Sequence, residues 1–237
     1  MSHLGPALLA VIVLIALEST PIDATISGWF FDPVTGGFPL RYNVAFEIAT
    51  HQWAKYIVLL IGSAVIAGYL LSHIVPALAT RRRLLLFLSL ALTLAPVAVI
   101  LLKAGSPRHC PYDLIEYGGY AAHVGLFDPV PSGQNPGHCF PGGHASGGFC
   151  LLAFYFAGVE MRNRVVAMTG LWGGLAAGML FGMARVAQGA HFLSHNLWSA
   201  VVCWLVTLAL YLVIIGAPNS DHRLQLKARG QTPLKEQ

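Results

Sequence analysis

Residues 140–159 of the chain read FPGGHASGGFCLLAFYFAGV, which is a proline, two glycines and a histidine followed by fifteen apolar or small residues. We expect a membrane-spanning helix that begins at about His144. Gly142 and Gly143 free the backbone amides to turn toward a bound group, and the first turn of a helix carries a partial positive charge that attracts anions. The stretch therefore predicts a span with an anion-binding turn at its start. Ordinary glycine capping of a helix is the alternative.

The composition of the 237-residue chain excludes an ordinary soluble domain. Hydrophobic residues make up 56% of the chain and charged residues 10%, whereas a soluble domain has about 25% charged residues. The formal net charge of +4 does not indicate nucleic-acid binding, because the basic residues occur in short clusters between apolar runs. Four cysteines without a C-x-x-C pair do not support a zinc ribbon. We therefore expect an integral membrane protein with no nucleic-acid partner.

Six apolar runs predict an all-α bundle of six transmembrane helices, which forms a single domain over residues 1–237. The runs are 4–17, 53–75, 84–102, 144–159, 165–183 and 197–216. Between them lie outer loops at 18–52, 103–143 and 184–196, and a cytoplasmic tail follows at 217–237. The first run is short for a span and resembles the apolar part of a secretory signal. No basic residue precedes it, however, so we favour an uncleaved helix.

Four glycines recur at every fourth position of the fifth run and share one helix face: Gly170, Gly174, Gly178 and Gly182. A face of small residues lets a neighbouring helix approach closely. We interpret it as a packing face, which serves either within one chain or between two copies of the chain.

The distribution of basic residues predicts the orientation of the bundle. An even number of spans puts both termini on one side, and nine basic residues fall on that side against five on the other. The nine are Arg81, Arg82, Arg83, Arg162, Arg164, Arg223, Lys227, Arg229 and Lys235. By the positive-inside rule this side is cytoplasmic. We expect a protein of the bacterial inner (plasma) membrane whose long loops face the periplasm or the exterior.

Histidines and cations gather at the outward ends of four predicted helices. Lys103 ends the third, His144 begins the fourth, Arg185 ends the fifth, and His191 and His195 precede the sixth. Fixed cations beside a glycine turn form an anion site, and phosphate is the common biological anion that requires this much charge. Two histidines allow covalent phosphoryl transfer, in which one attacks phosphorus and the other protonates the leaving oxygen.

Two other interpretations of these residues are open at this point. Basic side chains near a membrane border often extend to the lipid headgroups without any further role. A histidine metal site is the second, but the chain has no H-E-x-x-H or H-x-H cluster, so we expect no metal.

The three groups of residues resemble the motifs of the type 2 phosphatidic acid phosphatase superfamily, which also contains glucose-6-phosphatase and vanadium haloperoxidases. The first motif begins at Lys103 and reaches Cys110-Pro111, the second is Pro141-Gly142-Gly143-His144, and the third is Ala184-Arg185 followed by His191 and His195. The order of the motifs and the six-span layout both fit this family.

The resemblance implies a role for each matching residue. His191 would be the nucleophile that forms a phosphohistidine, and His144 would be the general acid for the leaving group. Lys103, Arg185 and the backbone of Gly142–Gly143 would hold the phosphate oxygens. The resemblance further implies a metal-independent hydrolase of phosphoric esters or diphosphates that uses no cofactor.

Three positions depart from the family pattern. Cys110 stands where the family has an arginine, and Arg108 is the candidate replacement. Gly142 replaces a serine, so one hydroxyl donor is lost. His195 replaces the aspartate that orients the nucleophile. A neutral histidine can accept the same hydrogen bond without adding negative charge, and Asn196 is a second candidate for this role.

Cys110 and Cys139 lie in the same outer loop, beside the first and second motifs. In an oxidising compartment they could form a disulfide that holds the two motifs together, and two free cysteines are the alternative. Cys150 and Cys203 fall within predicted helices, where we expect them to be packing residues.

The leading functional hypothesis is a membrane phosphatase for a lipid phosphate or diphosphate, because a site at headgroup depth suits a substrate whose tail stays in the bilayer. The candidate substrates are a polyprenyl diphosphate, phosphatidate, phosphatidylglycerophosphate and lipid A phosphate. A phosphotransferase acting between lipids is the close variant. The alternative of a different class is a non-catalytic lipid-phosphate binder or a transporter, although no internal repeat supports transport.

Overall fold

The structure is a computed structural model that describes residues 3–216. Within this range the chain is helical and has no β-strand, as the all-α prediction expects. Its α-helices are α1 (Leu4–Leu17), α2 (Ile22–Gly28), α3 (Val44–Glu47), α4 (Trp53–Leu71), α5 (Pro76–Ala79), α6 (Arg82–Ala104), α7 (Gly143–Phe149), α8 (Ala153–Glu160), α9 (Arg164–Ala187) and α10 (Leu193–Leu210). The predicted tail at 217–237 lies outside the described residues.

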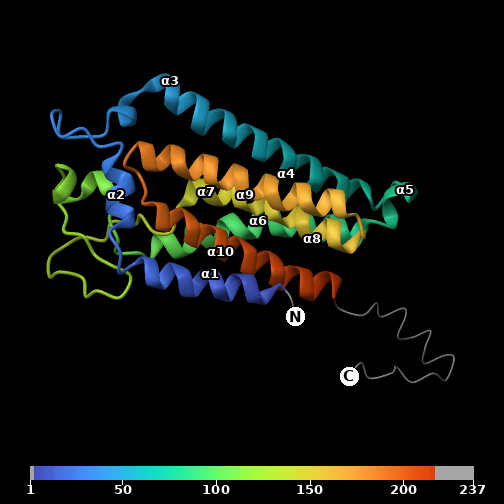
Figure 1. Cartoon of the computed structure of the whole chain (residues 1–237). Helices are drawn as coiled ribbons and strands as arrows, with labels where there is room; N and C mark the ends of the chain where they lie inside the picture. Colours follow the sequence, from blue (N-terminus) through green and yellow to red (C-terminus); the bar gives the residue numbers. More distant parts are fainter. Residues whose placement is uncertain (1–2, 217–237) are drawn as a thin grey trace.

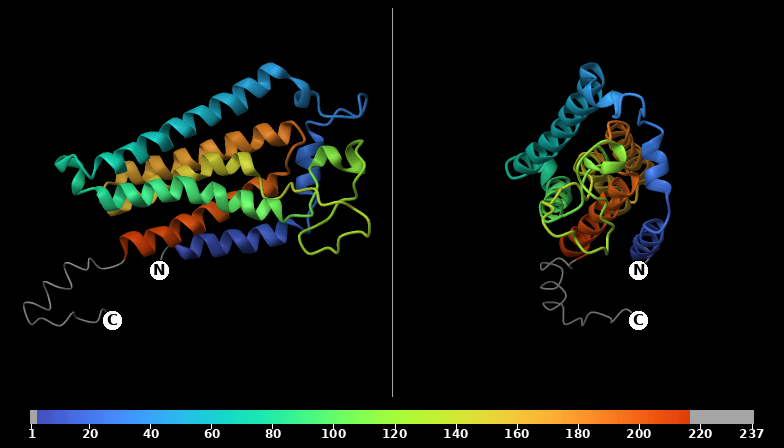
Figure 2. Two further views of the ribbon diagram at one scale, coloured as in Figure 1. Left: turned by 180° about the vertical axis from the view of Figure 1, so that it is seen from behind. Right: turned by 90° about the vertical axis from the view of Figure 1, so that its left-hand side faces the viewer.

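The long helices lie side by side along one axis of the molecule. Helices α1, α4, α6, α9 and α10, together with α7 followed by α8, run in this direction, and α2 lies across one end (Figure 1). The loop between α6 and α7 covers the same end (Figure 2). The start of α1 and the end of α10 lie at the opposite end, so both ends of the described chain share one side of the bundle.

Four of the described helices are long and apolar enough to cross a membrane: Val44–Leu71, Arg82–Ala104, Arg164–Ala187 and Leu193–Ile215. A fifth candidate span is α1 with α2, which are bent by 75° at the break between them. The predicted fourth run is divided by a 3-10 turn at Cys150–Leu152 into two short helices, α7 and α8. Helix length and composition therefore support a helical membrane protein, but they do not establish the six spans that the sequence predicts.

The second predicted span begins earlier in the structure than in the sequence analysis. The side chain of Asn43 accepts a hydrogen bond from the Phe46 backbone N–H at 2.9 Å. This cap satisfies an amide that a helix start leaves unpaired. The helix therefore begins at Val44 instead of Trp53, and α3 continues through a π-helical turn into α4.

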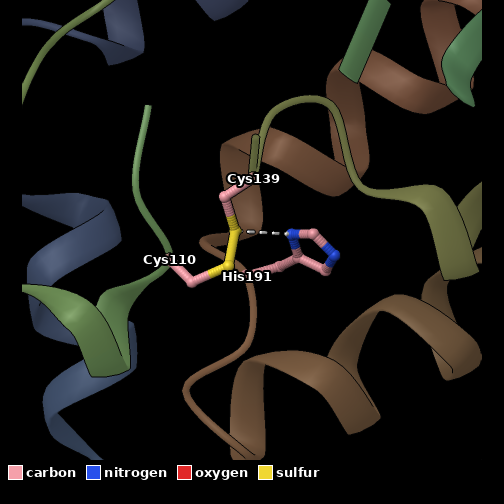
Figure 3. Close-up of side chains that lie close together, drawn as sticks. All are labelled: Cys110, Cys139 and His191. Atoms are coloured by element: carbon pink, nitrogen blue, oxygen red, sulfur yellow. Dashed lines mark hydrogen bonds between the residues drawn. A yellow bond between two sulfur atoms is a disulfide. The ribbon is translucent and has the colours of Figure 1, made fainter. Parts of the chain in front are cut away.

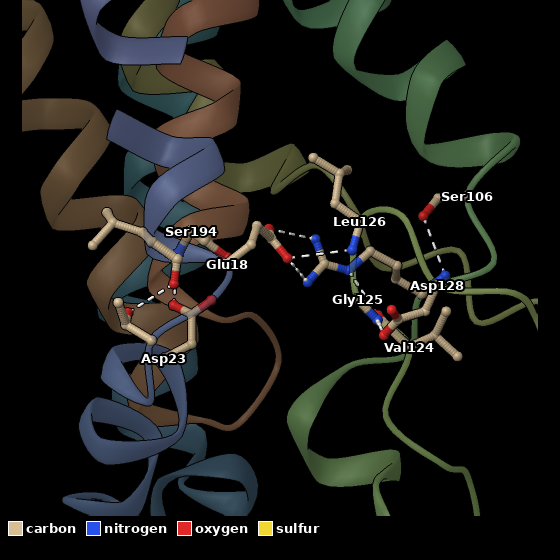
Figure 4. Close-up of polar contacts among 11 residues, drawn as sticks. Glu18, Asp23, Ser106, Val124, Gly125, Leu126, Asp128 and Ser194 are labelled. Atoms are coloured by element: carbon tan, nitrogen blue, oxygen red, sulfur yellow. Dashed lines mark hydrogen bonds and ion pairs between the residues drawn. The ribbon is translucent and has the colours of Figure 1, made fainter. Parts of the chain in front are cut away.

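The last helix also begins earlier than predicted, and this moves a site residue into a helix. The Asp23 carboxylate accepts a hydrogen bond from the Ser194 backbone N–H at 2.9 Å (Figure 4). The acceptor comes from the other end of the chain, so no local sequence signal marks this helix start. As a result α10 begins at Leu193, and His195 lies in its first turn rather than in the preceding loop.

The glycine face of α9 packs closely on its neighbours, as its spacing predicts: most of it lies against the segment from α7 to α8, and Gly182 lies against Asn196 of α10. A Cβ on Gly178 would lie 2.2 Å from the Phe149 ring, and a Cβ on Gly170 would lie 2.4 Å from the backbone nitrogen of Tyr155. No side chain fits at these positions, so the helices approach to backbone contact. This packing fixes α7, and with it His144, against α9.

Apolar side chains from the outer segments form a small core over the start of α10. Its buried members are Phe38, Leu114, Tyr117, Ala121 and Phe192. Gly189, just after α9, has a φ of 67° and faces the Phe38 ring, where a Cβ would lie 2.3 Å away. The cluster therefore holds the short segment 188–192, which carries His191, at a fixed place above the bundle.

Candidate active site

Predicted site residues from separate segments converge at the loop-covered end of the bundle. His144 lies in the first turn of α7 and His191 between α9 and α10, and their ring centroids are 6.4 Å apart. Lys103, in the last turn of α6, passes beside the glycine turn, because a Cβ on Gly143 would be 4.0 Å from Lys103 Cδ. The structure thus brings both histidines and one cation of the predicted site together.

His191 is buried, with 2% of its surface exposed. Burial, and then the positive charges of Lys103, His144 and Arg185, hold the pKa of His191 well below its ordinary value of 6.5. The ring is therefore neutral at neutral pH, and one of its nitrogens carries a lone pair, as a nucleophile requires. The residues whose charges act on it are those that the sequence predicts for the phosphate site.

Arg185 is bound by protein side chains in the ligand-free structure. Its Nη1 and Nη2 donate to the Glu47 carboxylate at 2.9 and 3.1 Å, and Nη1 also donates to Gln188 Oε1 at 2.7 Å. The pair is only partly buried, with 12% of the Arg185 side chain and 36% of the Glu47 side chain exposed. A phosphate that binds Arg185 therefore competes with a carboxylate already in place.

Arg108 is not part of the cluster around His191. Its Nη1 and Nη2 donate to the two carboxylate oxygens of Glu18 at 3.0 and 3.1 Å, and its Nε donates to the Val124 carbonyl at 3.1 Å (Figure 4). Its guanidinium carbon lies 4.9 Å from the centre of the Phe140 ring, which in turn contacts the His195 ring at 5.3 Å. Arg108, the candidate replacement for the motif arginine, thus joins the outer loop at 103–143 to Glu18 at the end of α1.

The glycine turn is shaped by its contact with α10. The Gly142 N–H donates to the His195 carbonyl at 2.9 Å, and the Gly142 carbonyl accepts from Ser199 Oγ at 2.8 Å. A Cβ on Gly142 would lie 2.3 Å from Asn196 Oδ1, so the serine of the family motif would require the Asn196 side chain to move. Because the Gly142 amide is used within the protein, phosphate-binding amides of this turn must come from Gly143 and the residues after it.

The two residues expected to orient His191 contact it differently from the prediction. The His195 and His191 rings meet edge to face with centroids 5.8 Å apart. Neither His195 ring nitrogen reaches hydrogen-bond geometry with any described residue, and the same holds for Asn196 Oδ1. Asn196 Nδ2 instead donates to the Phe192 carbonyl within the first turn of the helix, at 3.3 Å.

Cys110 and Cys139 form a disulfide in the structure (Figure 3). It closes the outer loop beside the glycine turn, where the Cys139 N–H also donates to the Arg108 carbonyl at 2.9 Å. The cysteine sulfurs and a ring nitrogen of His191 lie within 4.8 Å of one another. Metal ions bind thiolates, and two sulfurs bonded to each other do not offer them, so in this form the cluster does not present a thiolate ligand set.

Sequence reasoning gives no sign of three charged residues that lie beside predicted site residues: Glu18, Glu47 and Lys55. The two glutamates bind the arginines of the predicted site, and Lys55 lines a cavity of about 370 Å³ together with His144. The position of a charged residue near the end of an apolar run does not indicate which residue it will pair with. These pairings follow from tertiary packing alone.

Comparison with known families links the site to its relatives. The family model of the PAP2 superfamily matches residues 84–217, which include every predicted catalytic and phosphate-binding residue. Comparison with curated proteins and with solved structures gave no match. Because the match covers more than half of the 237 residues, the chain belongs to the PAP2 superfamily, as its motifs predict, and this family is one of phosphatase-type enzymes that act on phosphorylated substrates.

Proposed function

We propose that this protein hydrolyses a lipid phosphate or diphosphate in the membrane through a phosphohistidine on His191. The observation that carries the proposal is the arrangement of a buried, neutral histidine and a second histidine with ring centroids 6.4 Å apart. Lys103 and Arg185 supply positive charge at the same place. A neutral nucleophile, a proton donor and fixed cations are the three parts that phosphoryl transfer through histidine requires.

The reaction takes two steps. The lone pair of His191 Nε2 attacks phosphorus, an N–P bond forms, and the bond from phosphorus to the leaving oxygen breaks while His144 gives that oxygen a proton. Water then attacks phosphorus and gives a proton to His144, and the N–P bond breaks to release inorganic phosphate. Lys103 and Arg185 offset the negative charge of the non-bridging oxygens in both steps.

A lipid substrate is favoured by the cavity that leads to His144. The cavity of about 370 Å³ lies between α4 and helices α6, α7 and α9, and most of its lining is apolar or small, including Val58, Gly62, Leu92 and Phe181. Helix α4 packs mainly on α6 and leans away from α9 toward the loop-covered end (Figure 2). A prenyl or acyl chain held there puts its phosphate beside the histidines. The four lipid phosphates named from the sequence are the substrates to test.

We infer that the site faces outward and that both termini face the cytoplasm. Arg81, Arg82 and Arg83 lie at the start of α6, Arg162 lies between α8 and α9, and Arg164 is the first residue of α9. These helix ends lie at the end of the bundle opposite the start of α7 and of α10 (Figure 1). The positive-inside rule makes this end cytoplasmic. The proposal places the protein in a bacterial inner membrane, with α1 and the α7–α8 pair as the two further spans of a six-span bundle.

The experiment that tests the proposal is phosphate release by the purified full chain in detergent from the four candidate lipid phosphates. We expect release by the parent and a loss of about 10²-fold or more in His191→Ala and His144→Ala, which remove the nucleophile and the proton donor. His73→Ala, at the opposite end of α4, is the matched histidine control and should keep full activity. A parent that binds these lipids but releases no phosphate contradicts hydrolysis.

Transfer to a second lipid is the alternative outcome, and one feature favours it. A second cavity of about 390 Å³ is lined by Leu102, Phe140, Pro141 and Trp198, on the side of the glycine turn where Arg108 lies. Its lining includes neither His144 nor His191, so an acceptor lipid bound there would have to extend its hydroxyl past the glycine turn to replace water in the second step. The same assay with a lipid alcohol added distinguishes the two reactions, because transfer yields a phosphorylated acceptor and no inorganic phosphate.

A further inference from the structure

The Cys110–Cys139 disulfide lies against the nucleophile of the proposed reaction (Figure 3). Cys139 Sγ is 3.4 Å from His191 Nδ1, and the two residues are 0% and 2% exposed, so water does not compete for the contact. A sulfur atom in a disulfide carries no hydrogen, so only the His191 Nδ1–H can donate in this contact. The lone pair of the neutral ring then lies on Nε2, the nitrogen that the proposed attack on phosphorus uses.

His195 stands at the position of the family's orienting aspartate and Asn196 is beside it, but His191 Nδ1 contacts the Cys139 sulfur. As described above, the ring nitrogens of His195 and the Oδ1 of Asn196 make no hydrogen bond to any residue in the described part of the chain. The backbone carbonyl of Cys139 lies close to both His191 and His195. The sulfur of Cys139 thus faces the nitrogen that a carboxylate faces in the family.

We propose that the disulfide is the positioning group of His191 and that its reduction slows turnover, an inference that rests on the proposed function. The reductant is a dithiol. One of its thiolates attacks a cysteine sulfur, the Sγ–Sγ bond breaks, and the second thiolate closes the reductant into a cyclic disulfide. Two electrons and two protons pass to the protein, and Cys110 and Cys139 become thiols.

Reduction allows the hydrogen bond at His191 to reverse its direction. A Cys139 thiol carries a hydrogen, and its two nearby acceptors are His191 Nδ1 at 3.4 Å and the Ala190 carbonyl oxygen at 3.1 Å. Donation to Nδ1 favours the tautomer with the ring hydrogen on Nε2, whereas donation to Ala190 leaves the tautomer unchanged, and nitrogen-15 NMR distinguishes the two. The tautomer with the hydrogen on Nε2 has no lone pair on the attacking nitrogen. Binding of the lipid phosphate depends on the cations and the cavity, which the disulfide does not touch, so the effect falls on kcat and leaves KM nearly unchanged.

The first test measures kcat and KM of the full chain before and after reduction by a dithiol, with a chelator present to keep metals from the freed thiols. We expect kcat to fall roughly 10- to 100-fold, the range seen when the group that orients a metal-binding histidine is lost, and to return on reoxidation. Cys150→Ser/Cys203→Ser, which keeps the disulfide, should respond in the same way. Equal kcat in the oxidised and reduced protein overturns the proposal.

A chemical rescue of kcat distinguishes two roles of the disulfide: a hydrogen-bond acceptor for His191 and a covalent link between two segments. In the Cys150→Ser/Cys203→Ser background, Cys110→Ala leaves Cys139 as a thiol and should show the low kcat. Methyl methanethiosulfonate then converts the Cys139 thiol into a methyl disulfide and releases methanesulfinate, which restores a hydrogen-free sulfur without the link. We expect kcat to rise several-fold. No rise, with modification shown by mass, means that the disulfide acts only as a structural link and overturns the positioning role.

The tautomer of His191 gives a readout that does not depend on activity. Nitrogen-15 NMR of histidine-labelled protein, with the His191 signals identified by their loss in His191→Gln, distinguishes a ring hydrogen on Nδ1 from one on Nε2. We expect Nδ1–H in the oxidised protein and a shift toward Nε2–H on reduction. The same tautomer in both forms overturns the proposal, since the Cys139 backbone alone would then hold the ring. If no form releases phosphate, the proposed function fails while this measurement still decides the hydrogen bond.

Discussion

At the scale of single residues, a carboxylate occupies the guanidinium of Arg185, which the proposed function assigns to the phosphate. Glu47 makes two hydrogen bonds to the guanidinium of Arg185, and Gln188 makes a third. Phosphate carries more charge than a carboxylate and can replace it on an arginine. Glu47 is at the end of α3, which continues through a π-helical turn into α4, and α4 borders the cavity that leads to His144.

This competition predicts the effect of Glu47→Gln. The amide keeps the size of the side chain but removes the negative charge, so KM for a lipid phosphate should fall about two- to fivefold, since a partly exposed ion pair contributes up to about 1 kcal/mol. The kcat should stay within about twofold, because Glu47 takes no part in the proposed chemical steps. Steady-state kinetics beside Glu116→Gln, an exposed loop glutamate, checks this, and a raised KM contradicts it.

At the scale of helices, the contact between α9 and the α7–α8 pair decides where His144 lies. The glycines of α9 meet backbone and ring atoms at distances that exclude a side chain, as at Gly178, where a Cβ would be 2.2 Å from the Phe149 ring. On another face of the same helix Gly173 has nothing within 4 Å of the position of a Cβ. The two glycines therefore differ only in what surrounds them.

The difference predicts that substitution by leucine is harmful at Gly178 and harmless at Gly173. Gly178→Leu should lower the free energy of unfolding by about 1–3 kcal/mol or more, because an extra side chain in a packed contact forces the helices apart. It should also reduce phosphate release, since α7 carries His144. Gly173→Leu should leave both properties nearly unchanged. Thermal unfolding in detergent, followed by circular dichroism, makes the comparison, and equal midpoints for the two variants contradict the packing argument.

At the scale of the whole molecule, α4 and the rest of the bundle enclose the cavity proposed for the lipid chain. Gly62 lines this cavity and has nothing within 4 Å of its Cβ position. There is thus room on α4 for a large side chain that fills the cavity without displacing a neighbour. Such a substitution separates binding of the lipid chain from the chemistry at the histidines.

Gly62→Trp should therefore lower kcat/KM for a long-chain lipid phosphate and spare a short, water-soluble phosphate ester. The expected loss is roughly tenfold or more, since altering a hydrophobic pocket changes discrimination by about 1–3 kcal/mol. Gly173→Trp, which faces open space on α9, is the matched control. An equal loss on both substrates would mean that the cavity does not hold the lipid chain.

The sequence predicts the helical class and the identity of the site residues better than it predicts where helices end and which side chains pair. The glycine turn with His144, the pair Arg185 and His191, and Lys103 follow from motif order, and the PAP2 match confirms the family. The predicted start of the last helix is four residues too late, because the side chain that caps α10 comes from Asp23, which is distant in sequence. Local patterns cannot indicate a cap of this kind.

The sequence by itself determined that this chain is a helical protein of the PAP2 superfamily, with apolar helices that fit a membrane protein and with two histidines and a set of cations near one end of the bundle. Apolar runs and motif order carry that information, because hydrophobicity and residue spacing are local properties of the chain. Only the tertiary structure decided that Glu47 covers Arg185, that Arg108 turns to Glu18, and that a disulfide sulfur faces His191. Each of these contacts joins residues far apart in sequence, so packing of the whole chain selects them.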